Sequence, residues 1–510
     1  MNRRAFLLAA GLGSLGCALG RGGLLAAAET GADGEAFSWD ILRAKAKALA
    51  SSNYQVHRQA MPEALAKLNY DQYRNIEFRP DKAIWNGTEQ PYRVQLFHNG
   101  YIYRDPVSIF VIENGRATPV RYDKAMFDFG PAELRVPLPD DAGFSGLRIH
   151  APVDEPNVFE EFLVFQGASY FRGKAKGQTY GLSARGIALD TAQPVGEEFP
   201  SFTAFWVQTP LPGEQLVTVY ALLDSPSTAG AYRFTVGRGV DVVMEVECEI
   251  HPRRVLTHAG IAPFSSMFFF GPADPSYHDD FRPRVHDSDG LLIQTSEGEW
   301  IWRPMVTAKQ ILYSMFSDEA PSGFGLMQRQ RDFEHYQDTN AGYEKRPSAW
   351  VQPLSDWGPG SVDLIELPTD SEYADNIVAF WRPRAPLEPG QAYPFRYRLS
   401  WCWHVPLQRR IAEVVLTRSG KGIPLGSRYF LIDFAGGDLH AQADEEHWDY
   451  EVSASAGYIR AYTVAANDHT NGKRIGLEYH PDGGKEADLS FQIRRFGHAV
   501  TEKWVYRWSP

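Results

Sequence analysis

The stretch RVQLFHNGYIYRDPVSIFVIENG, residues 93–115, decides the fold class. Three short segments within it alternate or run apolar with the period of two that is typical of β-strands: residues 93–98, 101–104 and 107–112. Asn99-Gly100 and Asn114-Gly115 favour the positive φ angles of tight hairpin turns. We therefore expect an antiparallel sheet to begin here, with hairpins at both turns.

The same pattern continues for about three hundred residues. Further strand-like runs are residues 162–165, 202–207, 217–223, 242–250 and 267–270. Helical periodicity is confined to residues 38–75, where Ser38 suits a helix start and Pro62 suits the start of a second helix. An all-β chain of this length closes most simply as a large two-sheet sandwich.

The C-terminal part of the chain has its own set of strand-like runs. Residues 393–403 still complete the large sandwich, so we place the boundary after them. The runs that follow it are residues 429–434, 458–464, 474–479 and 489–494, with a turn at Asp482-Gly483. We expect a large β-sandwich over residues 36–404, a linker at 405–411 and a sandwich of immunoglobulin-like size over 412–510.

Composition excludes several classes of partner. The 510 residues carry 51 basic and 63 acidic side chains, a formal charge of -12 without long runs, so no basic stripe exists to hold nucleic acid. Beyond the N-terminus no apolar run approaches the roughly 20 residues that span a bilayer, so we expect no stable membrane insertion. The aromatic content of 13% suits sandwich cores and sugar-stacking platforms equally well.

Residues 1–28 predict an export signal. Asn2-Arg3-Arg4-Ala5-Phe6-Leu7-Leu8 precedes a weakly apolar stretch and the small-residue site at residues 26–28. Paired arginines before such a core are typical of twin-arginine signals, and ordinary secretion is the alternative. Cys17 lies in a poor match to a lipoprotein site, so we expect it to leave with the signal. The expected destination is the periplasm.

Two cysteines remain in the mature chain, Cys248 and Cys402. In an oxidising compartment they can form one disulfide, or they can stay free and buried in strands. Two cysteines indicate no metal site.

The first candidate site is Val285-His286-Asp287-Ser288-Asp289-Gly290. An imidazole beside Asp287 would keep that carboxylate ionised and able to take a proton from water. Asp-x-Asp-Gly also resembles part of a calcium loop, but the other ligand positions do not fit. An Asx turn that closes a hairpin is the plainest interpretation.

The second candidate is Asp375, at the mouth of the apolar run 377–381. Desolvation there would raise its pKa, as a proton donor for glycosidic cleavage requires, although a strand-end cap explains the residue as well. The third is residues 332–350, where aromatic and hydrogen-bonding side chains alternate in a long loop. Such a loop suits sugar binding or a structured surface equally.

These segments carry a resemblance to a known family. From about residue 36 to its end, the chain resembles the OpgG/OpgD (MdoG/MdoD) family of periplasmic glucan biosynthesis proteins. The motifs that carry it are residues 165–172, 180–186, 198–200, 203–206, 260–263, 286–289, 335–338 and 374–377. The twin-arginine signal favours the OpgD branch.

The resemblance implies a galactose-mutarotase-like β-sandwich followed by an immunoglobulin-like sandwich, and a glycoside hydrolase-like activity on β-1,2-glucan. It implies Asp375 as general acid and Asp287 as general base of an inverting reaction. No cofactor and no metal are implied. Residues expected to bind the substrate are Tyr343, Arg346, Trp350 and His335.

Three functions stay open at this point. The first is a β-1,2-glucanase that shapes the glucan backbone, and the second is a cyclising transglycosylase on the same site. Residues 339–342 differ from the pattern expected of hydrolytic members, and loops of this kind decide whether water reaches the base. The third is a non-catalytic glucan-binding factor that assists the membrane glucosyltransferase of the pathway.

Overall fold

The computed structural model describes residues 34–56, 61–130, 142–211, 213–275, 278–442 and 445–510. The expected signal peptide, with Cys17, lies outside these ranges. Within them, no helix has the length and the apolar character needed to cross a membrane.

Helices occur near the start of the described chain, as expected. Helix α1 (Trp39–Ala50) begins at Ser38, whose hydroxyl accepts a hydrogen bond from the Ile41 amide. Pro62 precedes α2 (Glu63–Ala66), but that helix ends after one turn and α3 (Tyr70–Arg74) follows with its own capping box at Asn69. Single-turn 3₁₀ helices are η1 (Pro80–Lys82), η2 (Lys124–Met126), η4 (Phe333–His335) and η5 (Tyr343–Lys345).

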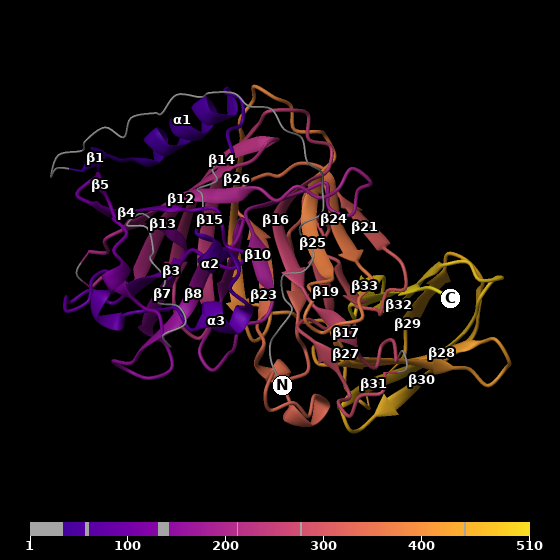
Figure 1. The fold of residues 1–510 in the computed structure, drawn as a ribbon. Coiled ribbons are helices and arrows are strands. Elements are labelled where there is room, and N and C mark those ends of the chain that lie inside the picture. The colour runs from indigo at the N-terminus through magenta and orange to yellow at the C-terminus, as the bar shows by residue number, and fades with distance from the viewer. Residues whose placement is uncertain (1–33, 57–60, 131–141, 212, 276–277, 443–444) are drawn as a thin grey trace.

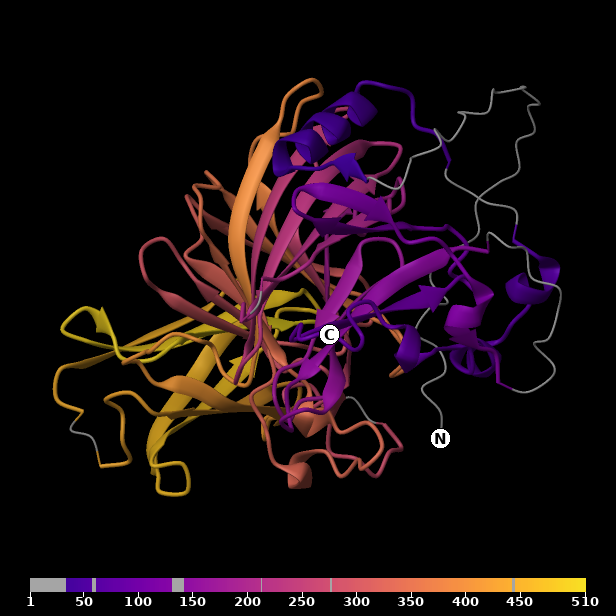
Figure 2. The same cartoon turned by 90° about the vertical axis from the view of Figure 1, so that its left-hand side faces the viewer.

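The largest sheet of the described residues is long, and Figures 1 and 2 show it from two sides. Its path through the large sandwich is β1 (Glu35–Ala36), β5 (Arg116–Pro119), β4 (Ser108–Glu113), β12 (Ser201–Gln208), β13 (Leu216–Asp224), β14 (Thr228–Gly237), β15 (Val242–Pro252), β26 (Tyr393–Cys402), β23 (Ser348–Pro353), β22 (Gly323–Met327), β19 (Gly290–Gln294) and β20 (Trp300–Pro304). Helix α1 covers its outer face, where Leu42 and Ala46 pack on Trp206 and Ala231.

A second sheet faces the first. Its order is β21 (Leu312–Asp318), β24 (Gly360–Glu366), β25 (Ile377–Pro383), β16 (Ala259–Ser266), β10 (Ser183–Arg185), β9 (Tyr170–Gly173), β8 (Phe159–Gln166), β7 (Phe144–Pro152) and β3 (Arg93–His98), with β11 (Ile187–Leu189) beside β16. Side chains of the two sheets share one core, in which the rings of Phe165 and Phe234 lie 5.2 Å apart. The predicted all-β sandwich is confirmed.

The two asparagine-glycine turns have different outcomes. Asn114 and Gly115 both have positive φ, 50° and 73°, and join β4 to β5 in the expected hairpin. Asn99-Gly100 forms no hairpin, because β3 pairs with β7 and residues 101–104 are not a strand. Two short ribbons complete this region and the site: β2 (Glu77–Phe78) with β6 (Phe127–Asp128), and β17 (Phe268–Phe270) with β18 (Val285–His286).

The strands after residue 412 enclose a second core. One layer is the sheet β27 (Glu413–Lys421), β28 (Arg428–Ala435), β31 (Gly472–His480) and β30 (Tyr458–Asn467). The other is β34 (Lys503–Trp508), β32 (Ala487–Arg495) and β29 (Trp448–Ala454), with β33 (His498–Ala499) at β32. We call residues 412–510 the C-terminal sandwich; its independence as a domain stays a prediction. Strand β34 extends the long sheet by pairing in parallel with β20.

Cys248 and Cys402 are both buried and free. They lie on the paired strands β15 and β26, but Cys248 is opposite Phe395, seven positions along from Cys402. At about 3.4 Å per residue that offset is far beyond disulfide reach. Of the two alternatives, the structure shows free thiols.

Candidate functional site: a cleft with two interacting aspartates

A cleft of about 1250 Å³ lies over one face of the second sheet. Strand alternation separates its lining from the core: Arg93, Gln95 and Phe97 of β3 line the cleft, whereas Val94 belongs to the core cluster. Strands β7, β8 and β9 contribute further polar and aromatic side chains, and loops after β17, β22 and β24 close the other side.

Cation–ring contacts organise the sheet side of the cleft. The Arg93 guanidinium lies 4.3 Å from the Phe159 ring centroid, and that of Arg148 lies 5.3 Å from Phe97. Arg148 also pairs with Glu161 at 3.0 Å. Flat rings flanked by charged hydrogen-bonding groups suit stacking against sugar faces and bonding to their hydroxyls.

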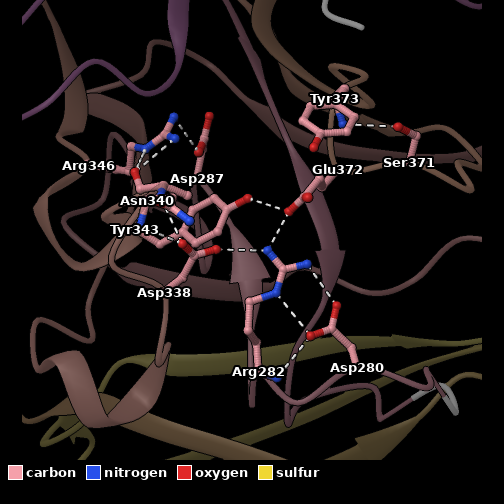
Figure 3. Close-up of polar contacts among 11 residues, drawn as sticks. Asp280, Arg282, Asp287, Asp338, Asn340, Tyr343, Arg346, Ser371, Glu372 and Tyr373 are labelled. Carbon is pink, nitrogen blue, oxygen red and sulfur yellow. Dashed lines mark hydrogen bonds and ion pairs between the residues drawn. The ribbon is translucent and has the colours of Figure 1, made fainter. Parts of the chain in front are cut away.

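Asp287 follows β18 and lines the cleft while its side chain is almost fully buried. Its Oδ1 lies 3.0 Å from Nη1 of Arg346, and its amide donates to the Met267 carbonyl. A neighbouring guanidinium favours the charged form of a carboxylate, which is the form that can accept a proton. Figure 3 shows the two side chains directed at each other.

Tyr343, the first residue of η5, and Arg346, the residue after η5, both line the cleft. The Arg346 guanidinium lies 5.1 Å from the Tyr343 ring and donates to the Ala341 carbonyl, which fixes its direction. The Tyr343 hydroxyl donates to Glu372 at 2.9 Å. Burial, and then the charges of Asp287 and Glu372, raise the pKa of Tyr343, so its phenol stays protonated.

Arg282 gathers three acidic side chains on the loop side (Figure 3). Its guanidinium pairs with Asp280, Asp338 and Glu372 at 2.7, 2.8 and 2.6 Å. Asp338 in turn accepts from the Ala341 amide at 2.8 Å, so the loop that carries Arg346 is tied to this cluster. Sequence reasoning missed Arg282 and Glu372, because isolated charges in loops carry no periodic signal.

Asp375 lies just before β25 and is partly exposed. Burial, together with the charge of Asp287, raises its pKa to about 7 against the opposing charges of Arg172 and Arg185. Asp287 and Arg172 both line the cleft. The structure thus brings the two predicted carboxylates within electrostatic reach. Asp287 forms an ion pair with Arg346, whereas for Asp375 the effects that raise the pKa outweigh those of its neighbouring arginines.

A three-residue spine sets the spacing of the two aspartates. The Ser266 carbonyl accepts from the amide of Asn376, next to Asp375, and the Met267 carbonyl accepts from the amide of Asp287. The Asn376 side chain completes the arrangement by exchanging two hydrogen bonds of 2.9 Å with the backbone of Phe268. Asp375 and Asp287 therefore lie on opposite sides of one short segment.

The neighbours of Asp287 in sequence do not act on it as predicted. His286 points into the core, where its ring stacks on Phe268 and bonds to Gln328, and burial lowers its pKa to about 4. A neutral imidazole cannot hold Asp287 ionised, and Arg346 fills that role instead. Asp289 accepts from the amides of Arg329 and Gln330, so the two aspartates of this motif face different partners.

Two predicted substrate-binding residues lie away from the cleft. Trp350 on β23 is 1% exposed and stacks on Trp300 at 5.7 Å within the second core, so the expectation of a cleft aromatic is corrected. His335 ends η4, lies 3.7 Å from Asp332 and is not among the side chains that line the cleft. Over the described residues, no three His, Cys, Asp or Glu side chains gather in a group fit for a metal ion.

The fold and the site define an all-β sandwich protein with an open polar and aromatic cleft. Asp287 lines this cleft, and Asp375, which is not among the lining side chains, interacts electrostatically with Asp287. The chain belongs to the family of the periplasmic glucan biosynthesis protein MdoG, whose model matches residues 37–508. Family membership assigns the protein to periplasmic glucan biosynthesis.

Curated relatives match over nearly the whole chain. The Glucans biosynthesis protein G of Rhodopseudomonas palustris (strain BisA53) is 45% identical over 93% of this chain and 94% of its own. That of Vibrio cholerae serotype O1 (strain ATCC 39541) is 45% identical over 93% and 87%. Both are named protein G, so the expected assignment to the OpgD branch is not confirmed. A galactose mutarotase related enzyme from Lactobacillus acidophilus aligns at 10% identity and a TM-score of 0.21, covering 50% of this chain and 94% of that structure.

Proposed function

We propose that the protein cleaves β-1,2-linked glucan in the periplasm by an inverting reaction, with Asp375 as general acid and Asp287 as general base. The observation that carries the proposal is the contrast between the two carboxyl groups. Asp375 has a pKa of about 7 and holds its proton near neutrality, whereas Asp287 is paired with Arg346. Family membership supplies the glucan as the substrate class.

The proposed reaction needs no covalent intermediate. Asp375 gives its proton to the glycosidic oxygen, directly or through a substrate hydroxyl, as the bond from that oxygen to the anomeric carbon breaks. Asp287 takes a proton from the water that attacks the same carbon from the opposite ring face. Arg346 and Tyr343 line the cleft beside Asp287 and would orient the sugar that carries this carbon.

The test compares the mature protein with Asp375→Asn on linear β-1,2-glucan, following product size and new reducing ends. An isosteric amide keeps the shape of the site but cannot donate the proton. Asp370→Asn is the matched control, because Asp370 is exposed and lies five positions earlier in the same loop. We expect shorter reducing products from the wild type and the control only.

The other outcomes separate the competing functions. Products of changed size without new reducing ends would show transfer to a sugar hydroxyl, and hence a transglycosylase. Glucan that the wild type binds but leaves intact would show a binding factor that assists the membrane glucosyltransferase.

A further inference from the structure

The residues that follow β22 connect three parts of the molecule. Residues 328–331, which we call the bridging segment, lie between the turn that carries Asp287, the η5 loop that carries Arg346, and the C-terminal sandwich. No residue of this segment has a place in the proposed reaction.

The bridging segment is hydrogen-bonded to the turn that carries Asp287. Oδ2 of Asp289 accepts from the amides of Arg329 and Gln330 at 2.6 and 3.1 Å. The Gln328 side chain donates to the His286 carbonyl at 3.1 Å. Asp287 therefore lies between two residues that are both fixed to this segment.

The same segment holds the cleft loop. Nε2 of Gln328 also donates to the Tyr343 carbonyl at 3.0 Å. Arg331 donates to the carbonyls of Glu344, at 3.2 Å, and Arg346. The base and its cationic partner thus share one support.

The C-terminal sandwich fixes that support through Glu502, which precedes β34 and has no exposed surface. Its carboxylate accepts hydrogen bonds from both terminal nitrogens of Arg329, at 2.9 and 2.7 Å. It also forms an ion pair with Arg409 and accepts a hydrogen bond from the Val414 amide at 2.8 Å. Despite burial, the two guanidinium groups and the amide lower the pKa of Glu502, so it stays ionised. The Arg329 guanidinium is further clamped 3.5 Å from the Trp302 ring centroid.

A bidentate, buried arginine–carboxylate pair has little freedom, so it anchors Arg329, and with it the bridging segment, to the C-terminal sandwich. We propose that Glu502 of the C-terminal sandwich is a positioning residue for the glucan-cleaving site, acting through Arg329 and Asp289 on the base Asp287. This inference rests on the proposed function. In this proposal the C-terminal sandwich helps to position a reacting group of the site.

The test replaces Glu502 by Gln in the full mature chain and measures the kinetics of β-1,2-glucan cleavage. A displacement of about 1 Å at a reacting group costs up to about a hundredfold in rate, so we expect kcat to fall at least about tenfold. KM should change by less than about threefold, because the cleft walls stay in place. Arg507→Gln is the matched control, since Arg507 lies on β34 and pairs with Glu486 and Asp488 without touching the bridging segment.

A pH profile separates positioning from a loss of folded protein. The negative charge of Asp287 helps to keep Asp375 protonated, so a displaced base should move the alkaline limb of kcat to lower pH. A smaller folded fraction lowers kcat without moving that limb. If Glu502→Gln fails to fold, Gln330→Leu decides instead, because it removes only the neutral contact to the Val415 carbonyl.

Three results are distinguishable. A fall in kcat with a shifted alkaline limb in Glu502→Gln or Gln330→Leu, and neither in Arg507→Gln, supports the proposal. Unchanged kcat and an unchanged limb in variants that fold, alongside an active wild type, overturn it and leave the proposed function standing. A wild type that cleaves no glucan overturns both.

Discussion

The side chain of Asn376 offers the sharpest test of how the two aspartates are spaced. It is buried, exchanges two hydrogen bonds with the backbone of Phe268 and donates a third to the Leu367 carbonyl. Replacing Asn376 by Leu keeps a side chain of similar size but removes all three bonds. Three backbone groups then lose their amide partner in the interior.

At about 1–1.5 kcal/mol for each buried hydrogen bond, the substitution should lower the free energy of unfolding by about 3–4 kcal/mol. Glucan cleavage should fall more than the loss of folded protein explains, because the segment before β25 carries Asp375 and is released from the spine. Urea unfolding followed by tryptophan fluorescence measures the first effect, and initial rates under conditions where the variant is folded measure the second.

Asn53→Leu is the matched control, because Asn53 is exposed and is not among the residues that line the cleft. The control should stay within about 0.5 kcal/mol of the wild type. A stability for Asn376→Leu within that same margin, together with wild-type rates, would refute the reasoning that this amide sets the spacing of acid and base.

Three more outcomes follow from the same structure. Burial raises the pKa of Asp375 from 3.8 to about 7, so ionising this carboxyl costs folding free energy as the pH rises through that interval. Asp375→Asn should therefore be more stable than the wild type at pH 8.5, by up to about 4 kcal/mol. Matched urea titrations near pH 4 should show no such gain. Arg346→Gln removes the cation 3.0 Å from Asp287 and should lower kcat/KM at least about tenfold, whereas an unchanged value would exclude Arg346 from the site. Cys248 and Cys402 should both be inert to a thiol reagent in the native protein and both react in denaturant, and a reductant should leave the thermal midpoint unchanged.

Sequence patterns predicted the strands well but not their partners. The asparagine-glycine pairs at residues 99–100 and 114–115 look alike, yet only the second closes a hairpin. A turn dipeptide describes local dihedral preference, whereas β3 chooses β7 because that pairing buries Val94 and Leu96 in the shared core. Pairing depends on burial across the whole sheet, which no local window contains.

The predictions of where the site residues lie were likewise correct for some residues and wrong for others. Asp287 and Asp375 were identified from family motifs, and burial at the mouth of β25 gives Asp375 the raised pKa that its apolar surroundings predicted. The imidazole of His286 was misassigned, because adjacent residues of an extended chain face opposite sides. The prediction for Trp350 was wrong for a related reason. A motif places a residue near a site along the chain but does not say which face of its strand the residue occupies.

The geometry around residues 266–268 separates what is fixed in this cleft from what can vary. Asp287 and Asn376, the residue after Asp375, are both tied by backbone hydrogen bonds to one spine, so changing the spacing of the two aspartates would require breaking these contacts. The loop of residues 338–346 is instead held largely by side chains, among them those of Arg282, Asp338, Gln328 and Arg331. A single substitution can remove a side-chain contact of this kind, whereas the backbone hydrogen bonds that Ser266 and Met267 accept involve no side chain. Whether water or a sugar hydroxyl reaches Asp287 should therefore depend on this loop.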